Sequence, residues 1–99
     1  TAPQALAYYR KAVEAEPTNR DFRLGLAVAL QQQNLPAEAL KQYQQLIAQN
    51  ANDAQIQYYY GTALHQAKRY PDAKAAYQKA LSLDANLKDA QDALASLEQ

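Results

Sequence analysis

Apolar residues recur along this chain at spacings of three, four and seven residues, and short polar stretches separate the apolar segments. This spacing is typical of amphipathic helices that bury one stripe of side chains, and it does not support strands. The pattern predicts helices over about residues 2–15, 20–33, 37–49, 54–67, 71–83 and 88–98. Only a few residues are left for each connection.

The pattern also repeats at an interval of 34 residues, and two types of helix alternate within it. In the helices near 2–15, 37–49 and 71–83, this shift aligns Ala5 with Ala39 and Ala73, and Tyr9 with Tyr43 and Tyr77. In the other three helices it aligns Leu26 with Tyr60 and Leu94, and Ala27 with Gly61 and Ala95. Short connections force neighbouring helices to run antiparallel. Similar pairs stacked at a fixed interval therefore predict an all-α, right-handed superhelix with one concave face.

Residues that favour helix starts stand at the expected boundaries. Short polar side chains that can accept hydrogen bonds from free amide groups precede the helices near 20, 54 and 88, namely Asn19, Asn52 with Asp53, and Asn86. Prolines, whose missing donor costs little in a first turn, stand at the other three starts, namely Pro3, Pro36 and Pro71. The residues at the helix starts therefore agree with two helices in each 34-residue repeat.

These residues resemble the tetratricopeptide repeat (TPR) family over essentially the whole chain. In the second whole repeat, the family pattern is similar to Tyr60-Gly61, Leu64, Ala73, Tyr77 and Ala80, with Ala85 where the family has proline. In the first, it is similar to Leu26-Ala27, Leu30, Ala39, Tyr43 and Leu46. The first repeat departs from the pattern at Arg23, where the family has tryptophan, and at Ala51, where it has proline. The resemblance divides the chain into a second helix of a partial repeat (1–19), two whole repeats (20–53 and 54–87), and a first helix of a following repeat or a capping helix (88–99). We expect these segments to form a single domain.

The resemblance also implies a function and a site. TPR proteins are non-catalytic scaffolds that bind peptide segments along the concave face formed by the first helix of each repeat. Carried over position by position, that face holds the groove residues Leu24, Val28, Gln31, Gln55, Tyr58, Tyr59, Thr62, His65 and Gln66. It also holds Asp21, with Gly25 and Gln32 beside it and Asp89, Asp92 and Ser96 on the last helix.

The chemistry of these side chains predicts the kind of partner. Apolar, aromatic and amide groups dominate, and the cations with which some TPR proteins grip a terminal carboxylate are replaced by Leu24, Val28, Tyr59 and Asp89. Apolar anchors together with amides that can bond a peptide backbone favour an apolar or weakly basic segment of a partner protein. The alternative is a spacer repeat, with the partner bound by neighbouring repeats of a longer protein.

Composition and charge exclude several other classes of function. The chain has 99 residues, 48% of them hydrophobic, and its ten Lys plus Arg balance ten Asp plus Glu. This balance gives no electrostatic reason to bind nucleic acid or an anionic membrane. No apolar stretch is long enough to cross a bilayer, and no signal segment is visible. The missing initiator Met suggests a fragment of a longer, soluble protein, whose compartment the sequence does not indicate.

Catalytic, metal and cofactor sites are not expected either. There is no cysteine, and His65 is the only histidine, so a metal site would lack converging ligands. A serine nucleophile needs a base within hydrogen-bond reach, but Ser82 and His65 are predicted on different helix types. We therefore predict no enzyme activity and no cofactor.

The incomplete repeats at the two ends suggest a second function. Residues 1–15 lack a preceding partner helix and residues 88–98 lack a following one. Head-to-tail docking of these segments from two copies would rebuild a whole repeat and produce a homo-oligomer. The polar side chains of the last helix, such as Lys88 and Glu98, instead favour a solubilising cap.

Overall fold

The computed structural model describes residues 2–98, and these form six helices and no strands. The helices are α1 (Ala2–Ala15), α2 (Arg20–Gln32), α3 (Pro36–Gln49), α4 (Ala54–Gln66), α5 (Tyr70–Leu83) and α6 (Lys88–Leu97). Every predicted helix is present with both of its ends within one residue of the prediction. The expectation of an all-α fold is therefore confirmed.

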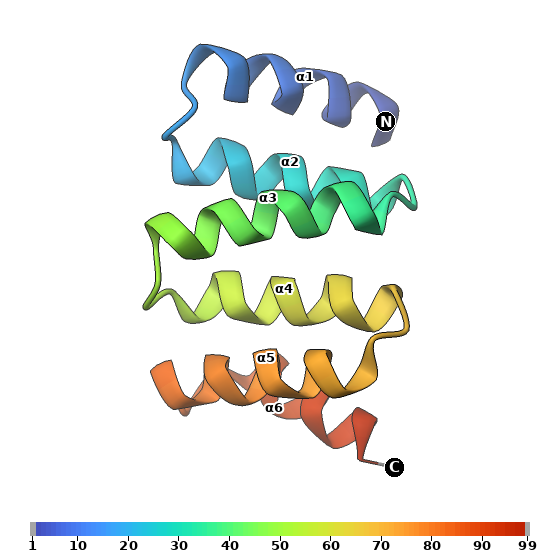
Figure 1. Ribbon diagram of the computed structural model, residues 1–99, viewed down its shortest axis with the longest axis vertical. Helices are drawn as coiled ribbons and strands as arrows, with labels where there is room; N and C mark the ends of the chain where they lie inside the picture. Colours follow the sequence, from blue (N-terminus) through green and yellow to red (C-terminus); the bar gives the residue numbers. More distant parts are fainter. Residues whose placement is uncertain (1, 99) are drawn as a thin grey trace.

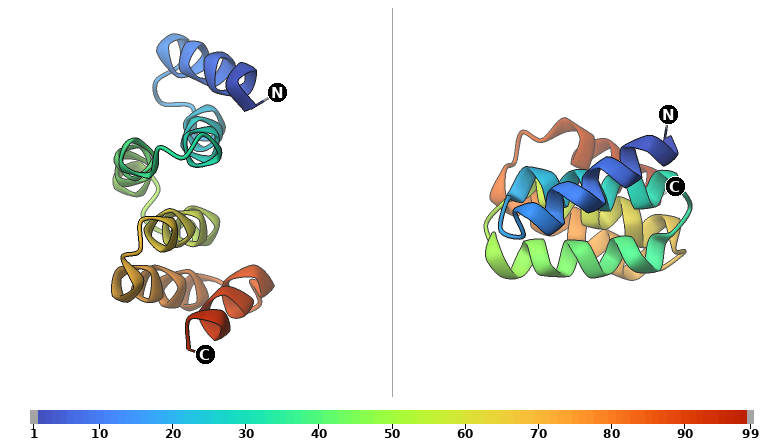
Figure 2. Two further views of the ribbon diagram at one scale, coloured as in Figure 1. Left: turned by 90° about the vertical axis from the view of Figure 1, so that its right-hand side faces the viewer. Right: turned by 90° about the horizontal axis from the view of Figure 1, so that it is seen from above.

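The helices are stacked one after another, and each contacts the next along the chain (Figure 1). Helix α2 also contacts α4 directly, one repeat further on. Figure 2 shows in its left view that α3 lies on the opposite side of the stack from α2 and α4. Helices α2 and α4 therefore line the same face of a curved stack 39 Å long.

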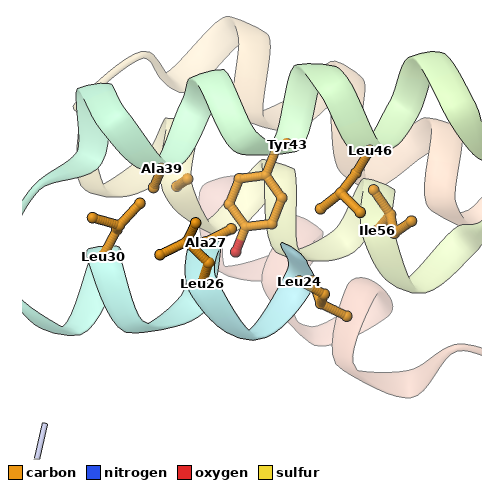
Figure 3. Packing of buried hydrophobic residues seen from close by; sticks show 9 residues of the cluster. Leu24, Leu26, Ala27, Leu30, Ala39, Tyr43, Leu46 and Ile56 are labelled. Carbon is orange, nitrogen blue, oxygen red and sulfur yellow. The ribbon is translucent and has the colours of Figure 1, made fainter. Parts of the chain in front are cut away.

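The core lies between successive helices, and Tyr43 stands at its centre. The side chain comes from α3 and is fully buried. Figure 3 shows its ring pointing toward α2, with Ala27 beside it and Leu46 further along α3. Tyr77, one repeat later, occupies the same place beneath α4 and is equally buried. One large aromatic ring per repeat thus fills the space between the paired helices.

Small residues on the facing helices make room for these rings. A Cβ atom built on Gly61 would lie 2.5 Å from Cε1 of Tyr77, and one built on Gly25 would lie 2.3 Å from Cε1 of Tyr9. Both distances are far below van der Waals contact. The two glycines are therefore needed for close approach of a tyrosine ring to the helix backbone.

Two of the predicted caps are formed and one is not. The Asn19 side chain accepts a hydrogen bond from the Phe22 amide at 2.9 Å, and that of Asp53 accepts one from the Ile56 amide at 3.1 Å. The prediction for Asn86 is wrong, because the residue preceding α6 is Leu87 and makes no side-chain cap. The amide of Asn86 instead donates to Asp84 in the turn.

Asp53 also joins the first helices of the two whole repeats. Its Oδ2 accepts a hydrogen bond from Nε of Arg20 at 2.8 Å. Partial burial alone would raise the pKa of the Asp53 carboxyl, but the bond from Arg20 and the amides of Ile56 and Gln55 outweigh it and hold the pKa below its ordinary value. A single carboxylate thus caps α4 and ties α4 to α2.

Replacing Asp53 with alanine is expected to lower the free energy of unfolding by about 0.5 to 2 kcal/mol at neutral pH, as loss of an N-cap does. Because folding lowers the pKa of the Asp53 carboxyl, its ionised form stabilises the folded chain. This contribution is fully present above the pKa of the unfolded chain, about 3.9, and is lost as the pH falls through the lower pKa of the folded chain. The difference between the natural chain and Asp53→Ala should therefore shrink on acidification. Urea unfolding at several pH values measures it.

The exposed neighbour Asn52 provides the control for this prediction. Its side chain does not cap α4, so Asn52→Ala should change stability by less than about 0.5 kcal/mol at every pH. Equal losses for the two variants would contradict the assigned role of Asp53.

Candidate functional site

A pocket of about 400 Å³ opens where α1, α2 and α4 meet. Four of the predicted groove residues, Leu24, Val28, Gln55 and Tyr59, contribute to its lining. The remaining lining residues are Ala5, Tyr9, Asp21, Gly25, Ala29 and Gln32. The structure thus brings part of the predicted set together around one hollow.

Sequence reasoning placed Leu24 on the exposed surface of the groove, and this is wrong. Only 9% of Leu24 is accessible, and it packs into the core. Figure 3 shows its side chain pointing away from the Tyr43 ring. Leu24 therefore contributes to the floor of the pocket.

Gln31 and Thr62 were expected to face a bound peptide, but their polar groups bond within the protein. The hydroxyl of Tyr43 donates to Oε1 of Gln31, and Nε2 of Gln31 donates to Oγ1 of Thr62 at 3.0 Å. Thr62 donates in turn to the Tyr59 carbonyl at 2.6 Å. This chain of bonds runs from α3 through α2 to α4. One donor and one acceptor position of the Gln31 amide are thus engaged within the protein, and the bonding of Gln31 to a peptide backbone stays a prediction.

Gln66 joins the same two helices at the end of the network. Its Nε2 donates to the Gln31 carbonyl at 3.0 Å and lies 3.4 Å from Oδ1 of Asn34. Although Gln66 is exposed, its amide nitrogen therefore already contacts the turn that follows α2. Gln66 thus supports the spacing of α2 and α4.

Tyr58 and His65 lie on α4 outside the pocket. The Tyr58 ring packs at 6.0 Å from that of Tyr77 and at 5.1 Å from that of Tyr59. Burial, followed by the charge of Asp89 and the neighbouring Tyr59, raises the pKa of the Tyr58 hydroxyl. His65 meets the exposed Tyr70 edge to face at 5.4 Å. Both side chains are half-buried, so each presents only part of its surface to a ligand.

Two lining residues of α1, Ala5 and Tyr9, were not predicted as site residues. The repeat alignment pairs them with Ala39 and Tyr43, which are fully buried under the first helix of their repeat. In α1 that position is uncovered, so Ala5 and Tyr9 are partly accessible. The unpaired helix at 2–15 was the signal in the sequence that could have indicated them.

The cations of α2 and α4 are Arg20 and Arg23, and both are bound to groups of the protein. Arg20 donates to Asp53, to Oδ1 of Asp21 at 2.7 Å and to Oε1 of Gln55 at 2.7 Å. Arg23 donates to the Pro17 carbonyl at 2.8 Å and to Gln42 at 2.6 Å. The contacts of Arg20 with Asp53 and Asp21 raise the pKa of its guanidinium, and the hydrogen bond to Asp53 is the largest cause. Neither arginine is available as a clamp for a ligand carboxylate.

Two further properties concern other kinds of site. In the stretch 2–98, no three His, Cys, Asp or Glu side chains gather where they could hold a metal ion. No helix in that stretch has both the length and the apolar character needed to cross a membrane.

Comparison with known proteins identifies relatives of the chain. It is 35% identical over 78 residues to the type IV pilus assembly protein PilF of Pseudomonas aeruginosa, a match that covers 79% of this chain and 30% of PilF. The chain thus spans less than a third of that relative.

Solved structures give the same fold. The first TPR of Spaghetti (RPAP3) bound to the HSP90 peptide SRMEEVD has a TM-score of 0.91 at 23% identity, covering 99% of this chain and 78% of that one. YrrB, a TPR protein with an unusual peptide-binding site, has a TM-score of 0.89 at 23% identity, covering 93% and 47%. These likenesses confirm the α-solenoid fold. Family models described as tetratricopeptide repeat match residues 2–58 and 54–87, and the chain therefore belongs to the tetratricopeptide repeat family.

Proposed function

We propose that this chain is a non-catalytic interaction scaffold that binds an extended segment of a partner protein across the face formed by α2 and α4. The observation that carries the proposal is the pocket between α1, α2 and α4, which has aromatic walls and a polar rim. The lining combines aromatic and aliphatic side chains with a few polar groups, and concave sites of this kind are common places for a ligand anchor. Two proteins of similar fold, Spaghetti bound to an HSP90 peptide and YrrB with its peptide-binding site, support a peptide segment as the ligand.

The proposal includes a division of the chain into repeats. Residues 20–53 and 54–87 form the whole repeats, residues 1–19 supply a second helix, and residues 88–99 supply a first helix or a cap. The binding face then consists of first helices, with α1 closing one end of it.

Tyr58 and His65 lie on α4 outside the pocket, so the double variant Tyr58→Ala with His65→Ala tests whether the partner segment extends from the pocket along α4. We expect it to abolish capture of a peptide selected on the natural chain from a displayed library. Its matched control is Gln44→Ala with Gln78→Ala, a pair one repeat apart and exposed on α3 and α5. The control should keep full capture, and circular dichroism should show equal helicity in all three chains.

The opposite result would show that the partner binds on another face of the stack. Loss of capture in the Gln44 and Gln78 variant, with capture retained in the Tyr58 and His65 variant, would place the partner on the other side of the stack. A library that yields no binding peptide would favour the spacer alternative, in which neighbouring repeats of a longer protein hold the partner.

Self-assembly is a second candidate function, and the uncovered face of α1 favours it. Ala5, Tyr9 and Ala12 remain partly accessible there, whereas their equivalents in α3 and α5 are fully buried. Ala95 on α6 is exposed, although its equivalents Ala27 and Gly61 are buried against a tyrosine-bearing helix. Helix α1 of one copy could therefore cover α6 of another. Against this, Glu98 stands at the position of the buried Leu30 and Leu64.

Light scattering over a hundredfold range of protein concentration separates the two candidates. A constant monomer mass would eliminate assembly. Growth of the mass with concentration, abolished by Tyr9→Ala, would support it.

A further inference from the structure

We infer that the pocket between α1, α2 and α4 takes one arginine or lysine side chain of the partner segment. The apolar stem of that side chain would lie between Tyr9 and Tyr59, and its cation would reach Asp21. The inference rests on the proposed function, because it names the anchor that the binding face accepts.

The shape of the pocket suits a long, thin side chain. Gly25 forms part of the floor, and because it has no Cβ the Tyr9 ring lies directly against the α2 backbone. Tyr59 lines the pocket from α4, and Leu24 and Val28 supply aliphatic surface between the two tyrosines. Lysine and arginine can bury their methylene stems on such a surface while keeping the charged end in water.

The charge at the rim favours a cation. The Asp21 side chain is 82% exposed, and the bond from Arg20 is made to its Oδ1 only. Two carboxylates, Asp21 and Asp53, surround the one guanidinium of Arg20, so this cluster keeps one net negative charge. Asp21 and the amide of Gln32 line the pocket and provide acceptor oxygens, whereas Oε1 of Gln55 already accepts from Arg20.

The aromatic walls add to the preference. A cation over the face of a tyrosine ring is attracted by the negative potential of the ring. The same surroundings disfavour an acidic anchor. The peptide SRMEEVD bound to Spaghetti carries three acidic residues, whereas both arginines of α2 are already bound to groups of this chain. The pocket is therefore expected to select the opposite charge.

Short blocked peptides of sequence Gly-Ser-Ala-Xaa-Ala-Ser-Gly provide the test, with arginine, norleucine or glutamate at Xaa. Titration of the ¹⁵N-labelled chain by NMR should shift the amides of Gly25, Val28 and Tyr59 with the arginine peptide. We expect it to bind about three- to tenfold more tightly than the norleucine peptide and the glutamate peptide to bind most weakly. Raising the salt from about 0.05 M to about 0.5 M should remove most of the advantage of arginine.

Two variants and a control sharpen the result. Asp21→Asn should bring arginine and norleucine to equal affinity, and Gly25→Ala should weaken both peptides because the added Cβ displaces the Tyr9 ring. Asp72→Asn, an exposed change on α5 outside the pocket and outside the predicted binding face, should leave all affinities unaltered.

Other outcomes would overturn the inference. Equal binding of arginine and norleucine by the natural chain would show an apolar anchor, and tighter binding of glutamate would show an acidic one. In both cases the proposed function would stand. Absence of shifts on α2 and α4 with all three peptides would also reject the pocket, and the library-selected peptide would then decide whether the face binds anything.

Discussion

Replacing Tyr43 with alanine is expected to lower the free energy of unfolding by about 3 to 5 kcal/mol, the range found when a large aromatic side chain is removed from a core. Tyr43 has no accessible surface and packs among Ala27, Leu30 and Leu46. Helix α3 cannot close the resulting cavity by moving, because it contacts α2 on one side and α4 on the other. Urea unfolding followed by circular dichroism measures the loss.

Two controls separate the contributions of the ring and of the hydroxyl. Tyr43→Phe keeps the ring but leaves Oε1 of Gln31 without its donor, which should cost about 0.5 to 1.5 kcal/mol. Tyr8→Ala removes a tyrosine that is 59% exposed and should change stability by no more than about 0.5 kcal/mol. If Tyr43→Ala were as mild as Tyr8→Ala, the placement of Tyr43 in the core would be contradicted.

Replacing Gly61 with leucine is expected to lower the free energy of unfolding by about 1 to 3 kcal/mol, as overpacking of a close contact does. The first atom of any side chain at this position would lie 2.5 Å from the Tyr77 ring. Tyr77 is buried, so its ring has no free space to enter, and α4 and α5 would have to separate. Thermal melting should show a lower midpoint.

The equivalent position in α6 supplies the matched control. Ala95 lies on α6 and is exposed. Ala95→Leu should therefore leave the melting temperature nearly unchanged. Equal shifts for Gly61→Leu and Ala95→Leu would indicate that the effect comes from the leucine itself and that the helix contact plays no part.

The candidate site was only partly predictable from the sequence. The repeat register correctly indicated that Val28, Gln55 and Tyr59 share a face, because residues at equivalent positions of successive first helices point the same way. The register could not show that the Leu24 side chain packs into the core while its neighbours on the same face are at least partly exposed. Nor could it show that Gln31 would bond to Tyr43, a contact that depends on the distance between two helices.

The sequence by itself determined the helices, their order and their repeat, because hydrophobic spacing, caps such as Asp53 and prolines such as Pro36 act over a few residues. Only the tertiary structure decided which polar groups remained available to a ligand. Gln31 donates to Thr62 across α2 and α4, whereas Asp21 keeps most of its surface in water. The physical reason is that hydrogen bonds between helices depend on how closely and at what angle the helices pack, and local sequence does not encode that geometry.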